Sequence, residues 1–247
     1  MSREIFSKAP ITEVILNIEV ELPLNFDIKQ FEKMHTGIIE KFPDMAERFQ
    51  WKGEVGLDVN NKPIVNSAFG GPDGYAFSSI NKKQVVQARK NGFTYNVLKP
   101  YECWEKFISE AKKYWEHYKL VCNPSRVNRV ELRYINRIEI PLPMNDFKDY
   151  ILTSPDIAPG IPYGVTDLFM RIAVPDETTD SVAIITEIID KESVTSTLLP
   201  FIFDIDVFYE IEREHVDNLW DLFEQMHDFK NRIFFSSITD KGRELFR

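Results

Sequence analysis

Alternating apolar and polar residues predict two similar strands, about half the chain apart. The first run, residues 11–22, ends at Pro23, and the second, residues 126–140, ends at Pro141. Alternation with a period of two is typical of a strand with one face in the core. Each run leads into a segment that suggests a helix. The two prolines are 118 positions apart, which suggests that the second half of the chain repeats the first.

The first half continues with a helix, a group of strands and a second helix. Residues 25–42 carry apolar residues at helical spacing and precede Pro43, which stops a helix. Residues 100–121 contain a broad apolar stripe that predicts a long helix. Between them we expect short strands at 48–53 and 54–60, a turn at 70–74, and strands at 75–80, 84–90 and 93–98. Asn91 and Gly92 are a favoured hairpin pair.

The second half follows much of this order. After Pro141 we expect a short helix at 144–152, a proline-rich connection at 154–164, strands at 168–174, 181–189 and 199–212, a long helix at 217–231, a strand at 232–239 and a closing helix at 240–246. Trp220 and Phe223 repeat the spacing of Trp104 and Phe107 at an offset of 116. Because strand–proline–helix order is common, coincidence is the alternative to an internal duplication.

These elements predict an α+β protein with a single domain, residues 1–247. It would consist of two pseudo-repeats, residues 9–122 and 123–247, that share one curved antiparallel sheet with the long helices on one face. The arrangement resembles the duplicated saddle of the TATA-box-binding protein fold, and the helix-grip fold is the alternative. Both folds leave a sheet face available to a partner, but neither implies a function by itself.

Composition and charge narrow the class of function. The chain has a formal net charge of −9 and a pI of about 5.1, so on average it repels phosphate backbones. Sequence-independent binding of nucleic acid would therefore need a local basic patch. Only 10 of the 247 residues are glycine, which disfavours a glycine-rich phosphate loop. Aromatic residues make up 13% of the chain, so flat rings must fill much of the core.

The two cysteines and the absence of long apolar runs indicate a compartment. Cys103 and Cys122 lie at the two ends of one predicted helix, roughly 28 Å apart, which is too far for a disulfide. A reducing environment is the natural interpretation. The N-terminal residues lack the apolar core of a signal peptide, and no window approaches 18 uncharged apolar residues. We therefore expect a cytoplasmic protein without a membrane partner.

Four segments carry a resemblance to a known family. They are KAPITEVILNIEVELP at 8–23, LRYINRIEIP at 132–141, LPFIFDIDVF at 199–208 and KNRIFFSSITDKGRELF at 230–246. From residue 9 to residue 246 the chain resembles a sporadically distributed prokaryotic family without an assigned function. The resemblance implies no enzyme activity and no catalytic residues. The patchy distribution of such a family implies genes in mobile genomic islands, including defence or toxin–antitoxin neighbourhoods.

The strongest candidate for a binding site is a row of arginines. Arg129, Arg133 and Arg137 alternate along one face of the second long strand. Guanidinium groups bind phosphate or carboxylate in a bidentate manner, so the row could bind an anion such as a phosphorylated small molecule. The alternative is pairing with carboxylates on a neighbouring strand, where residues 204–212 carry four acidic residues on one face.

Metal binding and catalysis have weaker signals. Asp204 and Asp206 form a D-x-D pair that could hold Mg²⁺ from one strand face, although no third ligand is evident. The four histidines show no spacing typical of a zinc site. No nucleophile or nucleotide motif occurs, so we predict no catalytic residue and no cofactor. Cys103 is expected to be a buried small hydrophobe, and Thr239 or Asp240 to cap the closing helix.

A basic hairpin is the candidate for binding nucleic acid. Lys82, Lys83 and Arg89 lie near strands with several aromatic residues, and such a surface could stack single-stranded bases. The alternative is that the aromatic residues face the core while the lysines protect an exposed hairpin.

The residues together favour a non-catalytic cytoplasmic binding or regulatory protein with a macromolecular partner, most readily a protein. The first alternative is an enzyme or sensor for a phosphorylated small molecule or nucleotide. The second is a nucleic-acid-binding saddle. Association with further copies of the chain is compatible with each of them.

Overall fold

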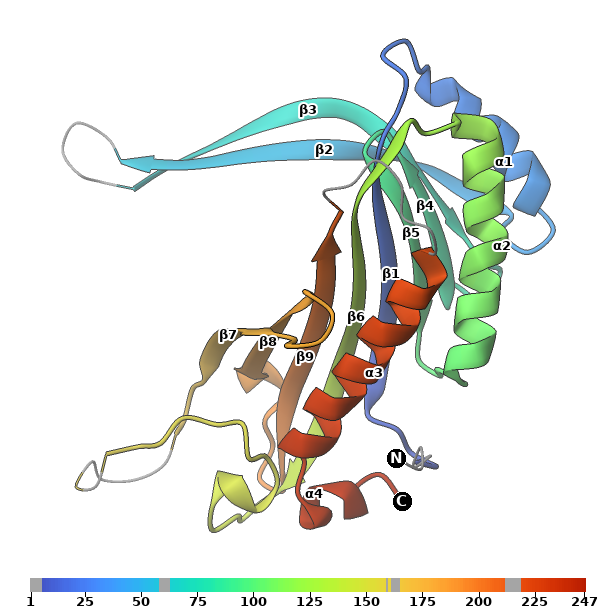
Figure 1. Cartoon of the computed structure of the whole chain (residues 1–247). Coiled ribbons are helices and arrows are strands. Elements are labelled where there is room, and N and C mark those ends of the chain that lie inside the picture. The colour runs from blue at the N-terminus through green and yellow to red at the C-terminus, as the bar shows by residue number, and fades with distance from the viewer. Residues whose placement is uncertain (1–5, 58–62, 159, 161–164, 212–218) are drawn as a thin grey trace. The chain divides into compact units, whose positions relative to one another are not determined.

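The computed structural model describes residues 6–57, 63–158, 160, 165–211 and 219–247, and leaves the side chains of residues 50–70 aside. The described chain is α+β, with nine strands in one antiparallel sheet and four α-helices (Figure 1). The strand order is β2-β3-β4-β5-β1-β6-β9-β8-β7. Two compact units share the chain. Unit 1 comprises Met1–Leu16, Leu98–Tyr101 and Arg129–Arg247; unit 2 comprises Asn17–Val97 and Glu102–Asn128.

Unit 2 contains two α-helices and a group of antiparallel strands. Its elements are the second part of β1 (Ile11–Glu21), α1 (Phe31–Ile38), β2 (Asp44–Leu57), β3 (Pro63–Ser78), β4 (Gln84–Arg89), β5 (Gly92–Leu98) and α2 (Trp104–Cys122). The core is aromatic because α2 presents its apolar stripe to β5. The Tyr95 ring stacks on Phe107 at 5.3 Å, and Phe93 lies 5.7 Å from Trp115.

Unit 1 contains the remaining strands and helices. They are the first part of β1, β6 (Arg126–Pro141) from Arg129 onward, β7 (Phe169–Pro175), β8 (Val182–Ile189), β9 (Leu198–Glu210), α3 (Leu219–Ser237) and α4 (Asp240–Glu244). Successive side chains of each strand point to opposite faces of the sheet. We call the face that carries Tyr134 and Phe203 the inner face, because α3 packs there through His227 and Phe234. The opposite face, which carries Arg133 and Asp204, is the outer face.

Several predicted elements are confirmed. The strands β1, β4, β5, β6, β7, β8 and β9 and the long helix α2 lie close to their predicted positions. The closing helix α4 also forms, and the Thr239 hydroxyl caps it by accepting a hydrogen bond from the Gly242 N–H at 3.0 Å. The strand predicted at 48–53 and the described part of the one predicted at 54–60 are instead parts of β2, which runs without a break from Asp44 to Leu57. Residues 58–60 lie outside the described residues.

The predicted turn at residues 70–74 is wrong. This glycine-rich segment belongs to β3, where Gly74 is opposite Arg48 and Pro72 is opposite Phe49 on β2. The pairing shifts its register between Arg48 and Phe49, so the glycines accommodate a bulge and not a chain reversal. At Gly74 a Cβ atom would lie 2.0 Å from the Ala88 carbonyl oxygen, so the close approach of β4 requires glycine.

Two predictions in the second half are also wrong. Residues 232–237, predicted as a strand, continue α3, because Ile233, Phe234 and Ser237 extend the buried face at helical spacing. The short helix predicted at 144–152 is only a 3-10 turn, Phe147–Asp149. It ends there because Ile151 forms a β-bridge with Ile238.

Candidate functional site

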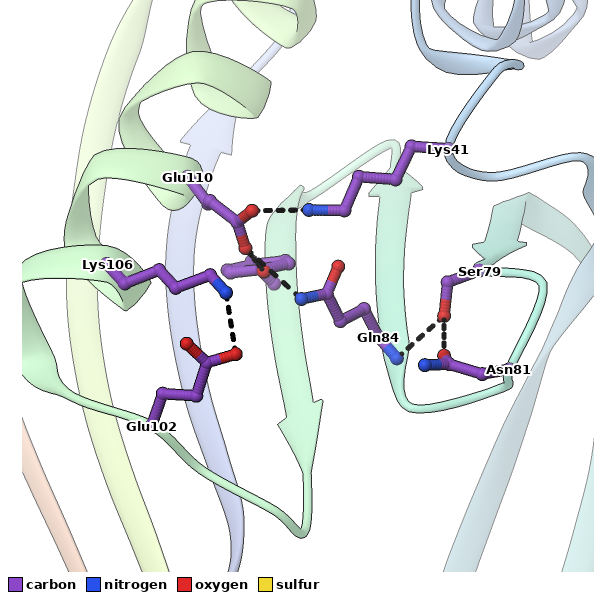
Figure 2. A network of polar contacts seen from close by, with 8 residues as sticks. Lys41, Ser79, Asn81, Gln84, Glu102, Lys106 and Glu110 are labelled. Carbon is purple, nitrogen blue, oxygen red and sulfur yellow. Dashed lines mark hydrogen bonds and ion pairs between the residues drawn. The ribbon is translucent and has the colours of Figure 1, made fainter.

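The residues with site-like chemistry in unit 2 surround Glu110 on α2 (Figure 2). One carboxylate oxygen of Glu110 accepts a hydrogen bond from the Lys41 ammonium. The other accepts from the Tyr95 hydroxyl at 2.5 Å and from the Gln84 amide at 3.2 Å. A second pair joins Lys106 to Glu102, one turn away on the chain, at 2.6 Å. These contacts hold the end of the α1 region, β4 and α2 against one another.

The pKa shifts in this network favour a deprotonated Glu110 and protonated Lys41 and Tyr95. Burial raises the pKa of Glu110, but the hydrogen bonds from Lys41 and Tyr95 outweigh it, so the net pKa is below its usual value. Burial lowers the pKa of Lys41, but its bonds to Glu110 and Tyr114 outweigh this and the net pKa is raised. Burial and the bond to Glu110 raise the pKa of Tyr95. A general acid or base needs a pKa near the working pH. The pKa values of these three groups are shifted away from neutral pH, so we interpret the network as one that stabilises the fold.

A shallow cavity of about 610 Å³ lies beside the network. Its lining residues are Glu40, Lys41, Ser79, Ile80, Asn81, Gln84, Glu102, Lys106 and Glu110. Both lysines of the lining are already neutralised, Lys41 by Glu110 and Lys106 by Glu102. An anion would have to displace a carboxylate from one of them, so the cavity offers no preformed positive charge for an anionic ligand.

The three arginines of the predicted anion site lie on the outer face of β6, and each has a carboxylate partner. Arg129 pairs with Glu131 and Glu210. The Nε of Arg133 donates hydrogen bonds to both carboxylate oxygens of Asp204, at 2.9 Å and 3.1 Å, and a terminal nitrogen of Arg133 donates another. Arg137 pairs with Glu139 and Asp190. The cross-strand pairing considered as the alternative therefore exists for Arg129 and Arg133, and a bound phosphate would have to compete with all of these ion pairs.

The two aspartates of the predicted metal site have different environments on β9. Asp204 is buried and held by Arg133. Asp206 is half-buried, one of its carboxylate oxygens has no hydrogen-bond partner, and burial together with the charge of Glu131 raises its pKa to about 6. In the described part of the chain no three metal-binding side chains of the Asp, Glu, His or Cys type converge.

The basic residues of the predicted nucleic-acid site are not brought together. Lys82 and Lys83 precede β4, whereas Arg89 ends it. The Lys82 ammonium pairs with Asp44, and Arg89 donates a hydrogen bond to the Asn17 side chain. The neighbouring aromatic side chains face the core, since each is no more than 6% exposed: Tyr75, Phe77, Phe93 and Tyr95.

Cys103 is exposed, which corrects the prediction of a buried residue. It is the N-cap of α2 and has an extended backbone, so it precedes the buried stripe that begins at Trp104. Cys122 at the other end of the helix is buried, and both thiols are free. Of the helices in the described ranges, none has the length and apolarity needed to cross a membrane.

The sequence interpretation missed a buried carboxyl group on β8. Glu187 lies on the inner face, fully buried, opposite Met170 on β7 and Phe203 on β9. Neither of its carboxyl oxygens has a hydrogen-bond partner in the described chain, and burial raises its pKa to about 8. The one sequence signal was its parity, which Glu187 shares with Ile185 and Ile189.

The edge of the sheet at β7 is a second feature that the sequence interpretation missed. In the strand order β7 comes last and pairs only with β8. At one end the Ile189 N–H donates to the Leu168 carbonyl at 3.1 Å, and at the other the Asp176 N–H donates to the Ser181 carbonyl at 2.7 Å. In an antiparallel ladder, residues that form backbone hydrogen bonds with the neighbouring strand alternate with residues that do not. The even-numbered residues of β7 therefore form the backbone hydrogen bonds with β8.

The odd-numbered residues of β7 consequently direct their backbone groups to the open edge. These residues are Phe169, Arg171, Ala173 and Pro175, and the side chains of all four are exposed. Phe169 is 71% exposed. Pro175 lacks an N–H, and proline is tolerated in a sheet where that group would face outward, in agreement with this register. No described residue forms a backbone hydrogen bond with this edge besides β8.

In comparisons with known proteins, no family model matches the chain, and no curated protein matches its sequence. The functional argument therefore rests on the geometry of the chain itself.

Proposed function

We propose that the chain is a non-catalytic cytoplasmic binding protein that engages another protein through the open edge of β7. The observation that carries the proposal is the alternation along this strand. Phe169, Arg171 and Ala173 have outward backbone groups and exposed side chains at the same time. Proteins usually protect an open edge with charged residues, a proline or a covering segment, because it is a template for another strand.

The composition of the edge supports a protein as the partner. Arg171 is the single charged residue of β7, and the remaining six residues are Phe, Met, Ile, Ala, Val and Pro. An extended segment of a partner can add to such an edge through main-chain hydrogen bonds, and its alternate side chains then give specificity. A phosphate backbone offers neither the peptide hydrogen bonds nor the apolar side chains that this strand can accept.

The experiment uses site-specific photo-crosslinking in cells that encode the chain. A benzophenone amino acid at Phe169 should form an adduct with one defined protein, and the same probe at Leu120, an 81% exposed residue of α2 in unit 2, should not. Ala173→Pro removes an N–H that points to the open edge, so it should abolish the adduct at Phe169 without unfolding the chain.

Three outcomes would contradict the proposal. One is an adduct at Phe169 that survives Ala173→Pro, because it would show contact without strand pairing. Another is the absence of any adduct specific to Phe169. The third is an adduct only with a second copy of the chain, which would make this edge a surface for self-association.

The finer part of the fold prediction, an internal duplication with a saddle like that of the TATA-box-binding protein, is proposed here as well. The order of strands within each half supports it. In the first half β1 is followed in the sheet by β5, β4, β3 and β2, and in the second β6 is followed by β9, β8 and β7. In each half the first strand lies beside the last, and in each the last strand is followed by a helix of 19 residues, α2 or α3.

A further inference from the structure

The outer face beside the edge of β7 carries one arginine that the fold leaves without an opposite charge. Arg171 is exposed and has no ion pair or hydrogen bond to any described residue. Its neighbour across the ladder on β8 is Thr186, which is neutral. The next residue in that row is Asp204 on β9, and Arg133 already holds it. The three arginines of β6 each have a carboxylate partner, so Arg171 differs from them.

We propose that the partner segment is an extended, mainly apolar stretch with one acidic residue that faces Arg171. The inference rests on the proposed function and adds the chemistry of the partner. In an antiparallel addition the residue opposite Arg171 would form a hydrogen-bonded pair with it, with Cα atoms about 5.5 Å apart and side chains on the same face. A carboxylate at that position meets an unpaired guanidinium, whereas a lysine or arginine meets a like charge.

The residues on both sides of Arg171 define the rest of the segment. Two positions away on the outer face the partner would contact Phe169 and Ala173. The residues next to the acidic one would point to the inner face, where Ile172 is 36% exposed beside Met170. All four contacts are apolar, so the preferred segment has apolar residues on both sides of its single carboxylate. The missing N–H of Pro175 limits the pairing at one end.

The edge itself disfavours one form of self-pairing. Two copies of β7 related by a two-fold axis between their Arg171 residues would place like charges directly opposite, which is destabilising. A two-fold axis at Ile172 would instead place Arg171 opposite Ala173, and that register leaves the guanidinium unpaired. The charge of the edge is therefore better satisfied by a different segment that supplies a carboxylate.

The test is fluorescence anisotropy with two blocked nonapeptides that carry glutamate or lysine at the centre, valine at the two positions on each side of it and threonine at the outer positions. The full-length chain should bind the glutamate peptide about 5- to 10-fold more tightly at low salt. Arg171→Glu should reverse the preference. Lys83→Glu, the same charge change at an exposed residue of unit 2, should leave it unchanged, and Ala173→Pro should abolish binding of both peptides.

The results distinguish the proposed edge function of β7 from the proposed acidic residue of its partner. Equal affinity for the two peptides, or a preference that survives Arg171→Glu, would overturn the role of Arg171. If neither peptide binds while the adduct at Phe169 forms and is lost in Ala173→Pro, the acidic segment is wrong and the proposed edge function stands. If the adduct is absent as well, both proposals fail.

Discussion

The two strand pairs of unit 1, β6 with β9 and β7 with β8, differ in how they treat charged residues. On the first pair the arginines are neutralised, and Arg133 and Asp204 form a bidentate contact across the ladder. On the second pair Arg171 is exposed without an opposite charge, and Glu187 is buried without a hydrogen bond from a described residue. Ion pairs account for the arginines at the centre of the unit, although Asp206 on β9 keeps one carboxylate oxygen without a partner. They do not account for Arg171 and Glu187 near the edge, and this difference directs the functional proposal to β7.

The largest expected effect concerns Glu187 and has a definite pH dependence. Its pKa is about 8 in the folded chain and near 4.5 in the unfolded chain, so the folded state binds the extra proton between these values. The stability that this proton provides is full below pH 4.5 and is lost as the pH rises to about 8, by a total of about 5 kcal/mol. Glu187→Gln cannot titrate and should lack this loss.

Urea denaturation of both proteins at several pH values checks this expectation. The free energy of unfolding of the wild type should fall relative to that of Glu187→Gln between pH 5 and pH 8. Parallel pH profiles would show that Glu187 is solvated or paired in solution, and the contrast between the two strand pairs would then rest on Arg171 alone.

The next largest effect on stability compares the backbone N–H groups of β7 that bond β8 with those that point to the open edge. Val174→Pro removes an N–H that bonds β8, so it should cost about 3 kcal/mol or more. Ala173→Pro removes an outward N–H and should cost less than about 1 kcal/mol. Thermal and urea unfolding of the two variants measure this difference directly. Equal losses, or a larger loss in Ala173→Pro, would show that the register assigned to β7 is wrong.

The smallest effect compares two arginines. Arg133→Ala leaves the buried Asp204 without its partner and should cost about 1–3 kcal/mol. Arg171→Ala removes an exposed side chain without a partner and should change the stability by less than about 0.5 kcal/mol. A double-mutant cycle with Asp204→Ala measures the coupling at Arg133. If Arg133→Ala instead abolished binding of inorganic phosphate at little cost in stability, the predicted anion site would be favoured.

Much of the fold could be predicted because alternation is a local signal. The strand over residues 126–141 was predicted close to its observed bounds, since its apolar residues apart from Val127 and Ile135 keep one parity. The C-terminal part of α3 was not, because Ile233, Phe234 and Phe235 are consecutive apolar residues that fit a strand as well as a helix. At residues 70–74 the glycines indicate a turn, and only the pairing with β2 shows a bulge.

The candidate site was less predictable because it depends on the order of the strands. The sequence indicated that arginines of β6 could pair with carboxylates of β9, but the diagonal choice of Asp204 by Arg133 needs the observed register, in which Arg133 is opposite Asp206. The sequence did not indicate that β7 is the edge strand of the sheet, because an edge strand and an internal strand can have the same residues. Glu187 has the parity of a buried residue, but β8 is apolar on both faces, so parity alone did not assign it.

The central claim is that the odd-numbered residues of β7 have free backbone groups. Residue-resolved hydrogen exchange of the free protein tests it most directly. The amides of Phe169, Arg171 and Ala173 should exchange rapidly, and those of Met170, Ile172 and Val174 should be protected by β8. Uniform protection of all six amides, or protection of the odd-numbered ones, would contradict the account, because the edge would then already be covered or the register would be reversed.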